Sequence, residues 1–233
     1  MDDKGDARES RRFATGRLAA RPRRVESAGP SGLHRLQIEG GRDGFVYAPK
    51  DAGHRWPAPL VLLLHGAGGD ARDTVNLLES PADRHGLILL VPDSRDYTWD
   101  IIRGGYGPDV AYIERALEQT FGRYEVDPSY VAAAGFSDGA SYALSLGATN
   151  GDLFTHVLAF SPGFMAPAAP HGSPKLFISH GTRDRVLPVD VCSRRIVPRV
   201  REAGYEVLYV EFEGPHTVPP AIAAEAVEWF LKD

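Results

Sequence analysis

The stretch that decides the fold is residues 131–142, with the sequence VAAAGFSDGASY. A run of small residues suited to a strand leads into Gly-x-Ser-x-Gly, and helix-forming residues follow at once. Small residues on both sides of Ser137 let the chain turn sharply, which lifts the hydroxyl clear of a sheet in a strained backbone conformation. The pattern predicts a serine at a helix N-terminus, where amide donors favour a developing negative charge.

On either side of this stretch, apolar runs alternate with helical patterns. Continuous apolar runs at 59–64, 86–91, 130–136, 156–160, 175–179 and 206–212 are typical of parallel strands covered on both faces. Residues 33–38 and 44–48 predict an edge hairpin with a turn at Gly40 and Gly41. Helical patterns occupy 71–85, 110–124, 137–146, 191–203 and 221–231. We expect a doubly wound, mostly parallel α/β sheet with helices on both faces and a site at the strands' carboxyl ends.

Composition excludes several classes of protein. The net charge of −5 is mild, and most basic residues outside the first thirty positions are interleaved with acids, so no basic face for a nucleic acid is indicated. The single cysteine, Cys192, excludes an intramolecular disulfide and a cysteine metal cluster. No run reaches the roughly 18 apolar residues of a membrane span. We therefore expect no cofactor, no metal, no nucleic-acid partner and no stable membrane anchor.

The N-terminal segment has a different character. Residues 1–31 are charged and punctuated by proline and glycine, which predicts a disordered arm before one domain at 32–233. The sequence SRRF at 10–13 looks like the start of a twin-arginine export signal. However, arginines at 17, 21, 23 and 24 interrupt the apolar region that such a signal needs, so a cytoplasmic location is expected.

Two loops after later strands carry partners for Ser137. Asp184 follows the strand predicted at 175–179, and His216 follows the last strand in a loop that contains prolines. This order and placement fit a nucleophile, an orienting acid and a base. The alternative for Asp184 is a loop acid paired with a neighbouring arginine. The alternative for His216 is an ordinary surface histidine. The other histidines after the serine, at 156, 171 and 180, are less well placed to act as the base.

A glycine-rich turn, LLHGAGGD at 63–70, follows a central strand. We predict that the backbone amides of Ala67 and Asp138 form an oxyanion hole, since donors of this kind stabilise a tetrahedral intermediate. The turn lacks the Gly-Lys-Ser/Thr ending of a phosphate-binding loop. Trp99, Phe164 and Met165, on loops at the same edge, are expected to line the substrate pocket, although such side chains can equally pack a loop onto the body.

Together, four motifs resemble the α/β-hydrolase superfamily and, within it, the bacterial phospholipase/carboxylesterase family of small serine esterases. The motifs are LHGAGG at 64–69, GFSDG at 135–139, GTRDRVLP at 181–188 and GPHT at 214–217. The resemblance implies an α/β-hydrolase fold and a triad of Ser137, Asp184 and His216. With only about 14 residues between the strands near 160 and 175, no cap domain is expected. Asp138 replaces a more usual glutamine, a departure that bears on the substrate range.

The resemblance implies hydrolysis of small or short-chain carboxylic esters through an acyl-enzyme, with water as the second acceptor and no cofactor. The chain also looks like poly(3-hydroxybutyrate) depolymerase-type and feruloyl esterases. A thioesterase, or a polyester or feruloyl-type esterase, is therefore the alternative among hydrolases. A non-catalytic binding protein on the same fold is the alternative from another class.

Overall fold

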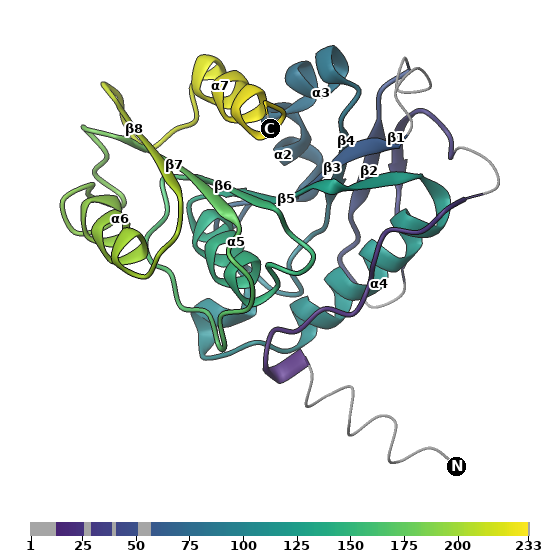
Figure 1. Ribbon diagram of the computed structural model, residues 1–233, viewed down its shortest axis with the longest axis horizontal. Helices are drawn as coiled ribbons and strands as arrows, with labels where there is room; N and C mark the ends of the chain where they lie inside the picture. The colour runs from purple at the N-terminus through teal and green to yellow at the C-terminus, as the bar shows by residue number, and fades with distance from the viewer. Residues whose placement is uncertain (1–12, 26–28, 39–40, 51–56, 233) are drawn as a thin grey trace.

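An eight-stranded sheet with the order β1-β2-β4-β3-β5-β6-β7-β8 runs through the protein (Figure 1). The computed structural model describes residues 13–25, 29–38, 41–50 and 57–232. The strands are β1 (Gly32–Arg35), β2 (Phe45–Ala48), β3 (Ala58–Leu64), β4 (Ile88–Val91), β5 (Val126–Phe136), β6 (His156–Phe160), β7 (Lys175–Gly181) and β8 (Val207–Phe212). β1, β2 and β4 pair antiparallel, and the pairs from β4 through β8 are parallel.

Helices cover both faces of the sheet. They are α2 (Ala71–Thr74), α3 (Glu79–His85), α4 (Pro108–Arg123), α5 (Asp138–Thr149), α6 (Ser193–Glu202) and α7 (Pro220–Phe230), with 3-10 turns η2 (Val75–Leu77) and η3 (Asp100–Arg103). Figure 1 shows α2, α3 and α7 on one face and α4, α5 and α6 on the other. Alternate side chains of β3 enter the two apolar cores between these layers, as a strand buried on both faces requires. The predicted fold class is confirmed.

The edge hairpin forms as β1 and β2, with Leu33 opposite Tyr47. Part of its predicted turn, at 39–40, lies outside the described residues. The prediction of one helix at 71–85 is wrong in one respect, because the segment divides into α2, η2 and α3. Pro81 has no amide hydrogen and fits only the first turn of a helix. A new helix therefore begins at Glu79, two residues before it.

The prediction of a disordered arm at 1–31 is wrong for residues 13–25, which lie along α4 and α5 (Figure 1). Leu18 is only 2% exposed and joins the core beneath these helices. The buried carboxylate of Glu114 accepts hydrogen bonds from the amides of Ala19 and Ala20. Asn150 accepts from the Leu18 amide. Partners far away in the sequence thus order a segment whose own composition predicts disorder.

Candidate active site

Ser137 lies between β5 and α5 in a strained backbone conformation. Its φ and ψ of 57° and −119° are unusual for a residue with a side chain. The Ser137 amide donates to the Phe160 carbonyl at 2.9 Å, which anchors the turn to β6. A side chain at Gly135 would lie 2.3 Å from the Gly139 carbonyl oxygen. The glycines flanking the serine therefore permit the close strand–helix approach that holds this conformation.

His216 connects the serine to Asp184. Its Nε2 lies 2.9 Å from Ser137 Oγ, and its Nδ1 lies 2.5 Å from Asp184 Oδ2. A serine hydroxyl donates to Nε2 when Nδ1 carries the hydrogen that faces the carboxylate. The imidazole ring also packs against the Phe136 ring, with centroids 4.6 Å apart. The structure thus brings together the three side chains that the sequence assigns to nucleophile, base and acid.

Asp184 is held in its ionised form. Its other oxygen, Oδ1, accepts the amides of Val186 and Leu187, both at 2.8 Å. Burial alone would raise the pKa of Asp184. The hydrogen bonds from the Leu187 amide and His216 outweigh burial, so the pKa lies below its usual value. A negative Asp184 fixes the tautomer of His216, with the hydrogen on Nδ1 facing the carboxylate.

His180 is a second histidine on the same carboxylate, a role that the sequence reasoning missed. Its buried Nε2 lies 2.7 Å from the Leu187 carbonyl oxygen and 3.3 Å from Asp184 Oδ2. Because a carbonyl only accepts, Nε2 carries the hydrogen, and Nδ1 accepts from Ser193 Oγ at 2.7 Å. Burial lowers the pKa of His180, which keeps this ring neutral. The spacing of four residues from His180 to Asp184 was the available signal.

The glycine-rich turn after β3 lies beside the serine. A side chain at Gly66 would be 3.4 Å from Ser137 Cβ. The Gly68 amide donates to Tyr97, and the Gly69 amide donates to Gly66, which fixes the turn. Among the described residues, the backbone amides of Ala67 and Asp138 have no hydrogen-bond acceptor. The assignment of these two amides to an oxyanion hole stays a prediction.

The prediction that Trp99 lines the pocket is wrong, because the side chain is 0% exposed. Its Nε1 donates to the His65 carbonyl at 2.8 Å, and its ring stacks on Tyr142. Trp99 therefore braces the glycine-rich turn from inside. Phe164 and Met165 are half-buried and line a groove against α6 that contains none of the three triad residues. Their place in an ester pocket stays a prediction.

A separate open hollow of about 500 Å³ adjoins His216 and is the better candidate for part of the substrate site. It is lined by Arg183, Arg185, Val186, Pro215 and His216.

Within the described part of the chain, no group of histidine, cysteine and acidic side chains is arranged to hold a metal ion. No helix among the described residues has the length and apolar character needed to cross a membrane.

Comparison with known proteins agrees with this architecture. Residues 113–191 match the model of the family described as "Putative esterase". The solved esterase PE8 has a TM-score of 0.62 at 23% identity, over 87% of this chain and 98% of that one. An S-formylglutathione hydrolase from Staphylococcus aureus has a TM-score of 0.67 at 17% identity, over 89% and 99%. The chain therefore has the α/β-hydrolase fold.

Curated relatives of this chain are also named as esterases. The putative esterase NocK of Nocardia uniformis subsp. tsuyamanensis is 30% identical over 57% of this chain and 42% of its own. A probable feruloyl esterase C of Aspergillus niger is 29% identical over 69% of this chain and 60% of its own. This chain thus spans less than two thirds of either relative. The matches support the resemblance to serine esterases that its motifs carry.

Proposed function

We propose that the protein hydrolyses carboxylic esters through Ser137, His216 and Asp184. The observation that carries this proposal is the unbroken line of hydrogen bonds from Asp184 through His216 to Ser137. The serine is set on a strained turn with its hydroxyl in reach of the base. Such strain costs on the order of 1–3 kcal/mol and persists only where the surrounding structure enforces it.

In the first half of the proposed reaction, Ser137 Oγ attacks the ester carbonyl carbon while His216 Nε2 takes the hydroxyl proton. The amides of Ala67 and Asp138 would donate to the oxyanion, and one such donor typically contributes about 10²–10³ in turnover. The tetrahedral intermediate collapses with cleavage of the bond to the alcohol oxygen. His216 returns its proton to that oxygen, the alcohol leaves, and the acyl group stays on Ser137.

Water then replaces the alcohol in the second half. His216 takes a proton from the attacking water, the bond between the acyl group and Ser137 Oγ breaks, and the serine regains a proton from His216. The carboxylic acid leaves, and the enzyme returns to its starting state. Asp184 keeps its charge throughout and stabilises the imidazolium formed in each half. His180 presents a neutral N–H to Oδ2 of that carboxylate, the same oxygen that faces His216, which helps to hold it in place.

The proposed substrates are esters with small or short acyl groups. The connection at 161–174 has no helix or strand, and His216 adjoins an open hollow. Open access suits compact esters of varied shape. Feruloyl-type esters are the second candidate, because several curated relatives, including those from Aspergillus niger and Emericella nidulans, are named feruloyl esterase C. Thioesters stay an alternative within the same chemistry.

The test is hydrolysis of p-nitrophenyl esters from acetate to palmitate, with methyl ferulate measured alongside. Ser137→Ala should lower kcat by about 10⁴–10⁶ with an unchanged fold. Ser129→Ala is the matched control, since Ser129 is exposed at the other end of β5 and should leave kcat unchanged. A fluorophosphonate probe should label the wild type and not Ser137→Ala. A folded wild type that neither labels nor turns over any ester would refute the proposal.

A further inference from the structure

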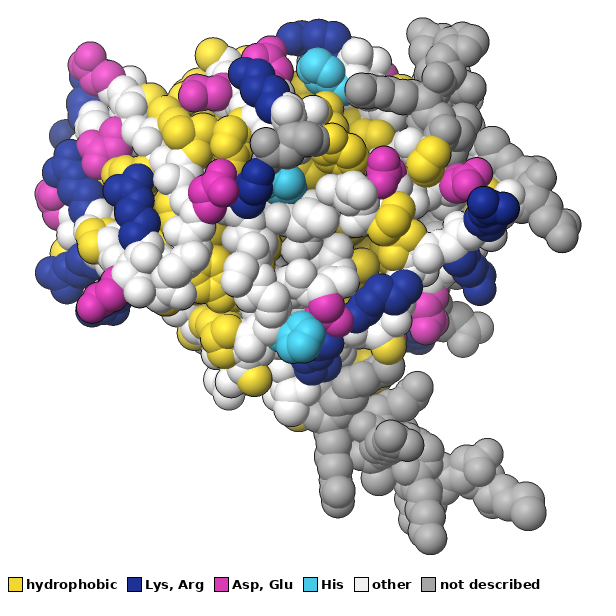
Figure 2. Space-filling model, in the orientation of Figure 1, with side chains coloured by type: hydrophobic (Ala, Val, Ile, Leu, Met, Phe, Trp, Pro, Cys, Tyr) yellow, Lys and Arg dark blue, Asp and Glu magenta, His cyan; other side chains and the backbone are white. Residues whose placement is uncertain are grey.

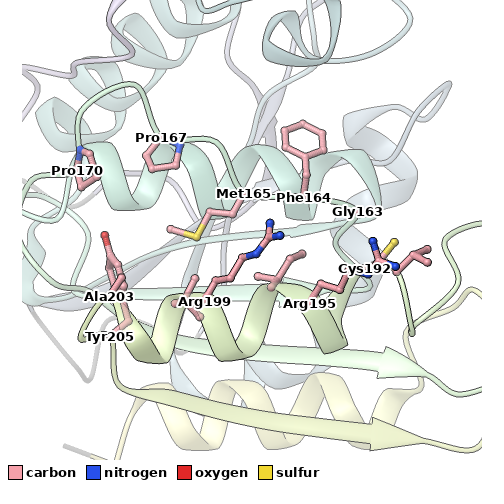
Figure 3. A pocket seen from close by; sticks show the side chains of 13 residues that line it. Gly163, Phe164, Met165, Pro167, Pro170, Cys192, Arg195, Arg199, Ala203 and Tyr205 are labelled. Atoms are coloured by element: carbon pink, nitrogen blue, oxygen red, sulfur yellow. The ribbon is translucent and has the colours of Figure 1, made fainter.

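A groove of about 350 Å³ lies between α6 and the loop that carries residues 163–170 (Figure 3). One wall is an apolar row formed by Cys192, which directly precedes α6, and by Ile196 and Val200, which lie four residues apart on one face of that helix. Met165 extends from the opposite loop toward that wall, and Tyr205 lies at one end. Ligand pockets of this size and character commonly accept small organic molecules.

A second row on α6 gives the groove a positive charge. Arg195 and Arg199 lie one turn apart beside the apolar row, and no acidic residue is among the residues that line the groove. Figure 3 shows their side chains extending from α6 into the space between this helix and the loop, and Figure 2 shows basic side chains, with acidic ones among them, on the edge of the molecule that carries α6.

These two arginines lack partners, unlike their neighbour. Arg194 binds Asp190 and Glu211 through side-chain hydrogen bonds. Within the described residues, neither Arg195 nor Arg199 has a hydrogen bond or an ion pair. Two like charges four residues apart on a helix repel by about 0.2–0.5 kcal/mol. An anion placed between them would remove that repulsion and satisfy both guanidinium groups.

We propose that this groove binds an organic carboxylate with an apolar body about the size of one aromatic ring and a short chain. The body would lie against Met165, Ile196 and Val200, and the carboxylate would accept hydrogen bonds from Arg195 and Arg199. The groove shares no residue with the triad or with the hollow at His216. Binding there is measured without ester turnover, so either proposal can fail without the other.

Met165 makes the proposal directly testable. The chain has two methionines, Met1 and Met165, so protein labelled with ¹³C at the methionine methyl groups gives one signal from the groove. The probe is 4-phenylbutyrate, and the neutral comparison is 4-phenylbutanol. We expect saturable movement of the Met165 methyl resonance with the acid and binding about threefold to tenfold weaker with the alcohol.

Variants of exposed arginines on the same helix separate recognition from general charge. Arg195→Gln and Arg199→Gln should each weaken 4-phenylbutyrate binding by about threefold to tenfold. Arg201→Gln makes the same change in charge at a residue that does not line the groove, and this variant should bind 4-phenylbutyrate like the wild type. The proposal is overturned if the Met165 resonance does not move up to the solubility limit of the acid. Equal affinities for acid and alcohol, or for wild type and both groove variants, would also overturn it.

Discussion

Gly139→Ala sets two physical effects against each other at the nucleophile turn. Gly139 lies in the first turn of α5, where helix propensity alone favours alanine by about 1 kcal/mol. In the fold, however, a Cβ at this position would lie 2.2 Å from the Leu64 carbonyl oxygen and 2.5 Å from that of His65. Propensity therefore predicts a more stable protein, and the tertiary contact predicts a less stable one.

The distances decide between the two effects. Ordinary contact begins at 3.4 Å, so the start of α5 must move away from the end of β3 by about 1 Å. Both clashing atoms are backbone, which cannot rotate aside as a side chain does. Overpacking costs about 1–3 kcal/mol and occasionally more, and these contacts place the cost at the top of that range. We expect a net loss of about 2 kcal/mol in the free energy of unfolding.

Urea denaturation measures this loss. With a slope of about 2–3 kcal/mol per molar urea, the midpoint should fall by about 1 M. Ester turnover should fall by about 10², because Ser137 and the turn at Gly66 move apart at the site. Gly107→Ala is the control, since a Cβ at Gly107 meets nothing within 4 Å. A higher midpoint and unchanged turnover in Gly139→Ala would refute the reasoning.

Three further predictions concern other parts of the structure. Asp184→Asn should lower ester kcat by about 10⁴, because the amide favours the wrong tautomer of His216, and near-wild-type turnover would count against Asp184 as the orienting acid. Leu18→Ala should cost about 2–4 kcal/mol of unfolding free energy by urea denaturation, whereas exposed Arg24→Ala should cost less than about 0.5, and equal midpoints would show that the burial of Leu18 adds no stability. Burial raises the pKa of Asp109 to about 6, so the folded protein keeps a proton that the unfolded chain has lost. As the pH rises from about 4 to 6, the wild type should therefore lose stability relative to Asp109→Asn. Parallel stability profiles of the two proteins would contradict this.

The chain's own pattern was sufficient for the fold class and for the grouping of Ser137, Asp184 and His216. Apolar runs of strand length alternate with helical periods, and only a sheet covered on both faces buries such runs. Parallel strands all end at one edge, so residues that follow three different strands in sequence converge there without further information. The glycines beside Ser137 mark its turn, because they leave space that a larger residue would fill.

Tertiary contacts decided what these patterns do not contain. The segment at 13–25 is ordered by Glu114 and Asn150, which lie about a hundred residues away or more. Trp99 is an aromatic residue on a loop, as a pocket residue would be, but it is buried and its Nε1 donates to the His65 carbonyl. His180 contacts Asp184 because the turn after β7 folds back upon it. Propensity and periodicity describe neighbours along the chain, whereas burial and hydrogen-bond partners depend on which distant segments meet.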